Sequence, residues 1–102
     1  MRITPEQAQA IMASGEDHVI LDVREAWKFE TLDKIKGAKH VYVEDLPAQI
    51  EAVIPNKETK VLIYCTAGVK SAKADQILTE MGYTQSLDFG GLDQWTGDVV
   101  SS

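Results

Sequence analysis

The sequence predicts one α/β domain with a central, mainly parallel, five-stranded β-sheet, and three observations lead to this prediction. Short runs rich in Val, Ile and Leu alternate with helical patterns along the chain, as is typical of β-α-β units. At 102 residues the chain has the length of one ordinary domain. Hydrophobic residues make up 44% and charged residues 25%, as in soluble globular proteins. We therefore expect a single domain over residues 1–102.

The chain opens with a short strand at residues 2–3 that leads directly into a helix. The segment 4–7 (TPEQ) is a helix start, because Thr can cap the helix, Pro suits its first position and Gln completes a capping box. Gly15 is a natural stop after the last turn of this helix. We expect the first helix between these two signals.

The middle of the chain predicts two further strands and two helices. Residues 18–22 (HVILD) form an apolar run that ends in a carboxylate, as expected of a buried strand. Residues 24–30 predict a short helical turn, and residues 41–43 predict a brief strand. Asp45, followed by Leu and Pro, starts another helix, which ends at the segment 55–57.

The last part of the chain contains the expected central strand, at residues 60–64 (KVLIY). A helix from about residue 71 follows, with apolar side chains at the i, i+3, i+4 and i+7 spacing of one buried helical face. Residues 86–89 add the fifth strand, and a Gly-Gly turn with a short helix over 92–95 comes next. The small and polar tail, residues 97–102, is expected to be frayed.

Charge and cysteine content exclude several classes of function. Sixteen Asp and Glu against ten Lys and Arg give a formal charge of -6, which disfavours nucleic acid or an anionic membrane as a partner. A single cysteine excludes an internal disulfide and a multi-cysteine metal site, and no metal or organic cofactor is implied. Neither a secretory signal pattern nor an apolar run of membrane-spanning length occurs. We expect a cytoplasmic protein, and a chain excised from a longer or exported precursor would show the same features.

The expected chemistry depends on Cys65, which lies between the strand 60–64 and the helix that follows it. In parallel sheets ligands bind beyond the carboxyl ends of the strands, where loops meet helix N-termini. Gly68 lets the loop curl so that successive N–H groups point inward, and the helix adds the positive end of its dipole. With the ammonium groups of Lys70 and Lys73, these donors favour a reactive thiolate and attract an anionic substrate.

Five motifs, spread over nearly the whole chain, form a specific combination. They are Leu21–Glu25 (LDVRE), Glu30, the pair Gly37–Ala38, Leu62–Ala74 (LIYCTAGVKSAKA) and Phe89–Trp95 (FGGLDQW). In this combination the chain resembles the rhodanese family of single-domain type. The resemblance implies a three-layer fold with helices on both faces of the sheet. It also implies a sulfurtransferase in which Cys65 takes sulfane sulfur from thiosulfate or a persulfide, becomes a persulfide, and passes the sulfur to cyanide, a thiol or a partner protein.

The resemblance assigns a role to each matching residue. The amides that would surround the persulfide belong to Thr66, Ala67, Gly68, Val69, Lys70 and Ser71. Ser71 would also cap the following helix, and Lys70 stands where the family usually has Arg. Asp22 and Arg24 would brace the active loop, with Arg24 paired to Glu30.

Two departures from the family pattern bear on the expected activity. The usual GHIPGA is replaced by residues 33–38 (DKIKGA), which alters the rim of the pocket. Lys70 replaces the Arg, so a planar bidentate fork for a thiosulfate-like anion becomes a mobile point charge. Thiosulfate is therefore expected to be a poor donor, with a persulfidated protein or a small thiol persulfide preferred.

Other readings of the same residues stay open. A catalytically weak or inactive interaction module would keep the fold and the thiol without turnover, and the Lys at position 70 favours this alternative. Cysteine phosphatases and arsenate reductases of similar loop type need five residues between Cys and Arg, whereas four separate Cys65 from Lys70. Cys65 could also be a redox-sensor thiol or a buried, inert one. His18 and His40 have no matching ligand motif and are expected to be structural.

Overall fold

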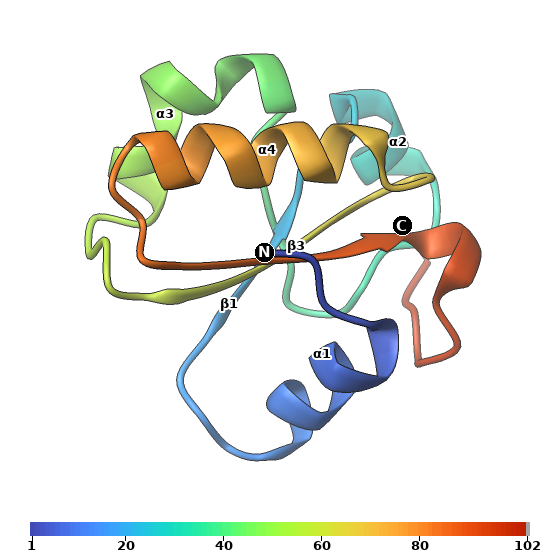
Figure 1. Cartoon of the computed structure of the whole chain (residues 1–102). Helices are drawn as coiled ribbons and strands as arrows, with labels where there is room; N and C mark the ends of the chain where they lie inside the picture. The colour runs from blue at the N-terminus through green and yellow to red at the C-terminus, as the bar shows by residue number, and fades with distance from the viewer. Residues whose placement is uncertain (102) are drawn as a thin grey trace.

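Four parallel strands form the sheet of the computed structural model, which describes residues 1–101 (Figure 1). The strands are β1 (Val19–Asp22), β2 (Lys39–His40), β3 (Lys60–Cys65) and β4 (Gln85–Gly91). They lie in the order β2-β1-β3-β4, and every neighbouring pair is parallel. Because β1 and β3 are adjacent, with Asp22 opposite Tyr64, the side chains of Asp22 and Cys65 come to the same edge of the sheet.

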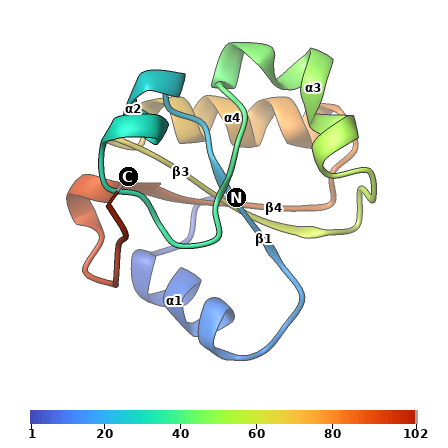
Figure 2. The same ribbon diagram turned by 180° about the vertical axis from the view of Figure 1, so that it is seen from behind.

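Helices cover both faces of this sheet, as Figures 1 and 2 show. On one face lies α1 (Pro5–Ala13), and on the other lie α2 (Ala26–Thr31), α3 (Leu46–Val53) and α4 (Val69–Glu80). Two short 3-10 helices are η1 (Val43–Asp45) and η2 (Leu92–Gln94). The predicted α/β fold with a parallel sheet between helices is confirmed. None of the helices within residues 1–101 is long and apolar enough to cross a membrane.

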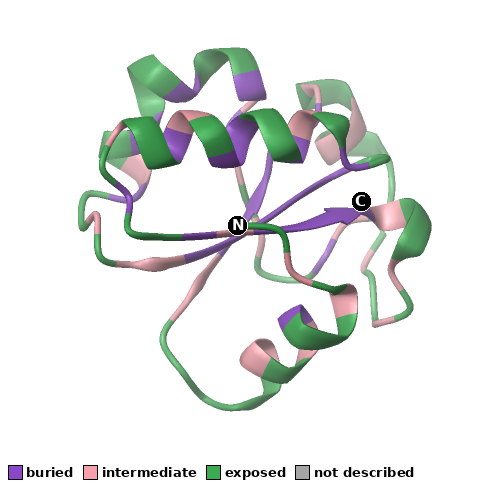
Figure 3. Cartoon of the chain, viewed as in Figure 1, coloured by how far each residue is buried: buried purple, intermediate pink, exposed green. Residues whose placement is uncertain are grey.

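Alternate residues of the central strands point into two separate hydrophobic cores. In β3, Val61, Ile63 and Cys65 belong to the core under α3 and α4. Leu62 and Tyr64 belong to the core on the side of α1. Figure 3 shows the result, with buried strands between helices whose outer faces are exposed. This alternation directs the side chain of Cys65 towards the α4 side of the sheet.

The start of α1 confirms the predicted capping box. The Thr4 hydroxyl accepts the backbone N–H of Gln7 at 3.0 Å, and the Gln7 side-chain oxygen accepts the N–H of Thr4 at 2.9 Å. Pro5 occupies the first helical position, where its missing N–H has no helical acceptor to lose. These local contacts fix the point at which the N-terminal segment, which lies beside β4, turns into the helix.

The prediction of five strands is wrong, because residues 2–3 do not form one. Arg2 makes only an isolated parallel bridge to Asp88 of β4. Its flanking residues provide the bonds, with the Ile3 N–H donating to the Asp88 carbonyl at 2.8 Å. The capped helix start at Thr4 follows at once, so too little extended chain remains for a strand.

Two further segments differ from the prediction. The second strand lies at β2 and not at residues 41–43, because Val43 already begins the 3-10 helix that leads into α3. The predicted frayed tail is paired at Val100. This residue forms an antiparallel bridge with Lys34 through N–H···O bonds of 2.7 and 2.9 Å. The end of the predicted frayed segment, Ser102, lies outside the described residues. A backbone pairing between segments so far apart in sequence leaves no local signal.

Candidate active site

Cys65 is the last residue of β3, and its sulfur lies beside the N-terminal end of α4. The residue is only 2% exposed. Its Sγ accepts the backbone N–H of Gly68 at 3.0 Å and that of Ser71 at 3.3 Å. Two amides therefore point at the sulfur, which is the arrangement expected around a negatively charged acceptor.

The loop between β3 and α4 curls back on the sulfur because of Gly68. This residue has a φ of +95°, in the left-handed region that glycine adopts without steric cost. It is also the N-cap of α4 and has no side chain with which to bond the first-turn amides. The positive end of the helix is consequently left open towards Cys65 instead of being closed by a capping side chain.

A pocket of about 180 Å³ opens at this loop and is lined by Cys65, Thr66, Ala67, Val69 and Lys70. Within residues 1–101, the backbone N–H groups of Ala67, Val69 and Lys70 have no acceptor. Unpaired donors around a small hollow form a concave anion-binding site. A larger groove of about 550 Å³ lies on the α1 side of the molecule, but Cys65 does not line it, so the thiol chemistry belongs to the smaller pocket.

Two ammonium groups and one carboxylate form the rim of this pocket. Lys70 Nζ lies 3.8 Å from one carboxylate oxygen of Glu25, and Lys28 Nζ lies 3.6 Å from the other. Lys28 also donates to the Thr66 hydroxyl at 3.3 Å. A hydrogen bond from its own backbone N–H, together with these two cations, lowers the pKa of Glu25 below its ordinary value. One carboxylate is thus shared by two cations, and a net positive charge remains at the rim.

The C-terminal end of β4 supports the loop from the side. A β-carbon at Gly91 would overlap the carbonyl group of Thr66, so only glycine lets the two backbones approach this closely. Two residues later, the N–H of Asp93 donates to the same Thr66 carbonyl at 3.2 Å. The Gly-Gly segment therefore holds the outer half of the loop in place.

A buried ion pair lies at the neighbouring strand end. Arg24 Nε is 3.1 and 3.0 Å from the two carboxylate oxygens of Asp22, and its Nη2 is 2.7 Å from the second. Arg24 also donates to the Asp33 carbonyl at 3.1 Å. Tyr64 lies below, and its hydroxyl accepts the Ile35 N–H at 3.2 Å. Burial, and then the Asp22 carboxylate, raise the pKa of Tyr64, so the phenol stays protonated. This cluster fixes the residue before Cys65.

Comparison with known proteins decides the family. The chain matches the family described as "Rhodanese-like domain" over residues 4–98. The chain belongs to the rhodanese-like domain family. The resemblance found in the sequence motifs is thereby confirmed.

Individual relatives of this rhodanese-like domain include curated enzymes and a solved structure. "Thiosulfate sulfurtransferase PspE" of Escherichia coli (strain K12) is 35% identical over 72 residues, which cover 71% of this chain and 68% of PspE. "Adenylyltransferase and sulfurtransferase MOCS3-1" of Zea mays is 33% identical over 96% of this chain, but the chain spans only 22% of that protein. The structure described as "rhodanese with anions from E. coli" has 30% identity and a TM-score of 0.77, covering 83% of this chain and 99% of the other.

The rhodanese-like loop gathers most of the residues that the sequence singled out. The pocket lining includes Lys70 but not Lys73, which is exposed on the next turn of α4. Ser71 is not the helix cap, because α4 begins two residues earlier than predicted and its N-cap is Gly68. The Ser71 hydroxyl instead lies 3.2 Å from the Gly68 carbonyl and 3.3 Å from the Gly90 carbonyl.

The predicted pair between Arg24 and Glu30 is wrong. The Asp22 carboxylate accepts from both Nε and Nη2 of the guanidinium, and Nη2 also donates to the Asp33 carbonyl. Glu30 lies on the exposed side of α2 and forms no ion pair within residues 1–101. In physical terms, the nearer carboxylate is buried and must be neutralised, whereas an exposed one can stay in water.

Sequence reasoning did not place three other residues at the site. Lys28 reaches the loop from α2, which follows the neighbouring strand β1. Gly91 appeared only as part of a predicted turn and of a family motif, and Arg2 only as part of a strand. A parallel order with β1 beside β3 would have pointed to Lys28, because loops after adjacent parallel strands meet at one edge. No local signal points to Arg2.

Proposed function

We propose that this rhodanese-like domain is a sulfurtransferase that carries sulfane sulfur as a persulfide on Cys65. One observation supports this most strongly. Cys65 Sγ already accepts two amides, while the neighbouring amides of Ala67, Val69 and Lys70 have no acceptor in the described part of the chain. A second, terminal sulfur carries the negative charge of a persulfide and extends from Sγ into the pocket that these residues line. These three unpaired amides are available to donate to the terminal sulfur of a persulfide.

The proposed reaction has two steps. The Cys65 thiolate attacks the outer sulfur of thiosulfate, the sulfur–sulfur bond of thiosulfate breaks, and sulfite leaves with the bonding electron pair. With a thiol persulfide as donor, the leaving group is the donor's thiolate. An acceptor such as cyanide, a small thiol or a protein thiol then attacks the outer sulfur of the persulfide and releases Cys65 as a thiolate. Each step exchanges one bond of sulfur for another, and neither step needs a metal, an organic cofactor or an oxidant.

The rim of the pocket sets the expected choice of donor. Lys70 offers a single ammonium group, which already faces the Glu25 carboxylate at 3.8 Å. Thiosulfate carries two negative charges and three sulfonate-type oxygens, for which an ammonium is a weaker partner than a guanidinium fork. A persulfide carries one charge on one sulfur and depends mainly on the loop amides. We therefore propose a persulfidated protein or small thiol as the preferred donor.

Sulfur loading is tested by intact-mass measurement of the protein after incubation with thiosulfate or with a small thiol persulfide. We expect one added sulfur atom that a reductant removes, and release of thiocyanate when cyanide is then added. Cys65→Ser should show no adduct. Its unfolding midpoint gives the control, because a serine hydroxyl can accept the same two loop amides. Absence of any adduct on folded wild-type protein with both donors would rule the proposal out.

A second function keeps the fold and the pocket but not the turnover. The near-complete burial of Cys65 favours a binding module, in which the loop amides and the net positive rim recognise an anionic group without transferring sulfur. The mass measurement separates the two functions, since a binding module gains no sulfur from either donor. In both cases we place the domain, residues 1–102, in a reducing compartment such as the cytoplasm, where a free thiol persists.

A further inference from the structure

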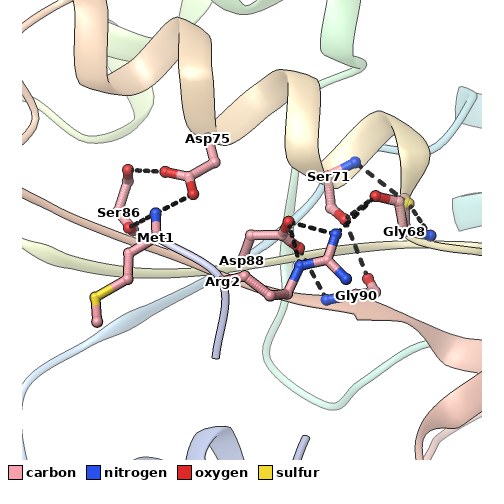
Figure 4. A network of polar contacts seen from close by, with 9 residues as sticks. Met1, Arg2, Gly68, Ser71, Asp75, Ser86, Asp88 and Gly90 are labelled. Atoms are coloured by element: carbon pink, nitrogen blue, oxygen red, sulfur yellow. Dashed lines mark hydrogen bonds and ion pairs between the residues drawn. The ribbon is translucent and has the colours of Figure 1, made fainter. Parts of the chain in front are cut away.

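We propose that Arg2 is a positioning residue for the sulfur-binding loop, because its guanidinium ties the Gly68 carbonyl to the buried Asp88 carboxylate of β4. This inference rests on the proposed function, which makes the loop amides the groups that must be aligned. Figure 4 shows the arrangement, in which Arg2 lies between the end of β4 and the start of α4. Nothing in the chain near Cys65 would suggest such a contact, because the two residues lie at distant points of the sequence.

The contact is well defined on both sides. Arg2 Nη2 donates to the Gly68 carbonyl at 3.0 Å, and its Nε donates to Asp88 Oδ2 at 2.8 Å. The other carboxylate oxygen of Asp88 accepts the Gly90 N–H at 2.8 Å. Asp88 is 2% exposed, so its charge needs this partner. One guanidinium therefore couples the loop to the strand that supports it.

The Arg2 guanidinium packs against the backbones of two glycines, Gly68 and Gly90. A β-carbon at Gly68 would be 3.5 Å from Arg2 Nη1 and Nη2, and one at Gly90 would be 3.4 Å from Nη1. The guanidinium thus packs directly against two backbones, without intervening side chains. A shorter or narrower side chain at position 2 would leave this space partly empty and the Gly68 carbonyl without that donor.

The Gly68 carbonyl matters because its peptide unit also carries the Val69 N–H. In a trans peptide these two groups point in opposite directions. The carbonyl is within hydrogen-bond distance of Arg2 Nη2, of the Ser71 hydroxyl and of the Ala72 N–H, at 3.0, 3.2 and 3.3 Å. With the carbonyl held there, the Val69 N–H points away from these donors and is free for a ligand. Glycine permits rotation of this peptide unit more readily than any other residue, and the opposite orientation would present a carbonyl where the amide now lies.

Arg2 aligns the loop peptides more than it changes the electrostatic potential at Cys65. The Asp88 carboxylate neutralises it at 2.8 Å, so the pair adds little net positive potential at Cys65. A separate cluster also ties α4 to β4 further along, where Asp75 accepts from the Ser86 hydroxyl and the Met1 amino group (Figure 4). The body of α4 therefore has its own anchor, and loss of the Arg2 contact should affect mainly the loop.

The test compares Arg2→Lys and Arg2→Ala with wild type. A lysine keeps the charge but cannot bond the carbonyl and the carboxylate as a fork. Both variants should lower kcat for sulfur transfer to cyanide by about tenfold, with a smaller change in KM, because misaligned donors weaken stabilisation of the reacting sulfur. The rate of Cys65 alkylation by iodoacetamide should fall in parallel. Lys57→Ala is the matched control, since Lys57 holds the Met81 carbonyl at the other end of α4 at 2.8 Å.

The two measurements keep this inference separate from the proposed function. Alkylation needs no sulfur donor, so it reports on the alignment of the loop even if the protein transfers no sulfur. Slower alkylation per folded molecule in both Arg2 variants supports the positioning role, with Arg2→Lys, which keeps a cation beside Asp88, unfolding at a midpoint close to that of Lys57→Ala. Wild-type alkylation and transfer in both Arg2 variants would overturn it while leaving the sulfurtransferase proposal intact. A lower unfolding midpoint with unchanged rates per folded molecule would likewise overturn it, because Arg2 would then be only structural.

Discussion

The ends of the two central strands lie at one edge of the sheet, and the loop that each strand end begins, residues 22–25 at β1 and 65–68 at β3, differs in whether its polar groups are paired within the protein. In the first loop, the Asp22 carboxylate accepts both the backbone N–H and the guanidinium of Arg24, and both residues are buried. In the second, a sulfur accepts two amides, and three neighbouring amides have no acceptor within residues 1–101. The first loop is closed by its own side chains. The second leaves donors for a ligand, and this difference separates a structural corner from a reactive one.

The largest expected effect is on stability and belongs to the first loop. Arg24→Ala leaves the fully buried Asp22 carboxylate without its partner, and breaking such a pair costs about 3–5 kcal/mol in the free energy of unfolding. Thr66→Ala is the counterpart in the second loop. Thr66 is exposed, so its loss should change the free energy of unfolding by less than about 0.5 kcal/mol. Urea unfolding measures both. Equal losses in the two variants would remove the distinction between the loops.

The next effect concerns the backbone of the second loop. Gly68→Ala places a β-carbon at a φ of +95° and should cost about 1–2 kcal/mol of stability. The strain should also turn the Gly68 N–H away from Cys65 and slow alkylation of the thiol, since this amide donates to Sγ at 3.0 Å.

Gly15→Ala provides the control for Gly68→Ala. Gly15 has a φ of +81°, and a β-carbon there would have nothing within 4 Å. It should lose similar stability through backbone strain alone and keep the wild-type alkylation rate. If both variants alkylate at the same rate, the Gly68 amide does not set the reactivity of Cys65.

A third effect tests the cation at the rim of the second loop. Lys70→Arg should lower the KM for thiosulfate by about threefold, because a guanidinium can bond two oxygens of the anion at once. Lys73→Arg makes the same exchange on the next turn of α4, outside the pocket lining, and should leave KM unchanged. Steady-state kinetics with cyanide as acceptor measure both variants. An unchanged KM in Lys70→Arg would mean that the missing fork does not limit the use of thiosulfate.

The same contrast explains how much the sequence could predict. Signals that depend on neighbours in the chain gave correct structure: the capping box at Thr4, the apolar run before Cys65 and the glycine that bends the loop. Contacts that depend on burial, or on which strands lie side by side, could not be predicted in this way. The pairing of Arg24 with Asp22 instead of Glu30 follows from burial, which a sequence does not display.

Arg2 illustrates the same limit more strongly. Its contact with Gly68 joins two points that are 66 residues apart, and it exists only because the segment before α1 pairs with β4. Residues 2–3 are extended and make one isolated bridge to Asp88, but the helix cap at Thr4 ends the extended segment before a strand can form. Long-range pairing decides both the number of strands and the support of the active loop.

The smallest effect lies where the two loops meet, at Glu25. Its pKa is lowered below the ordinary value of 4.5 by its own backbone N–H and by the cations of Lys28 and Lys70. A carboxyl whose pKa is lower in the folded state stabilises the fold above its ordinary pKa, and this contribution is lost as the pH falls through the folded value. Wild type should therefore be slightly more stable than Glu25→Gln near neutral pH, and the two should converge at acid pH, once the pH lies below the lowered pKa of the folded-state carboxyl.

Urea unfolding of wild type and Glu25→Gln at the two pH values measures this difference. The same substitution releases Lys70 from its carboxylate partner, so it should also lower the KM for thiosulfate near neutral pH, in the same direction as Lys70→Arg. A stability difference that persists at acid pH would mean that Glu25 acts through its hydrogen bonds and not its charge. The Glu25 side chain would then act as a structural hydrogen-bonding group, like Asp22 in the first loop. Lys70 would already be available to an anion in the native protein.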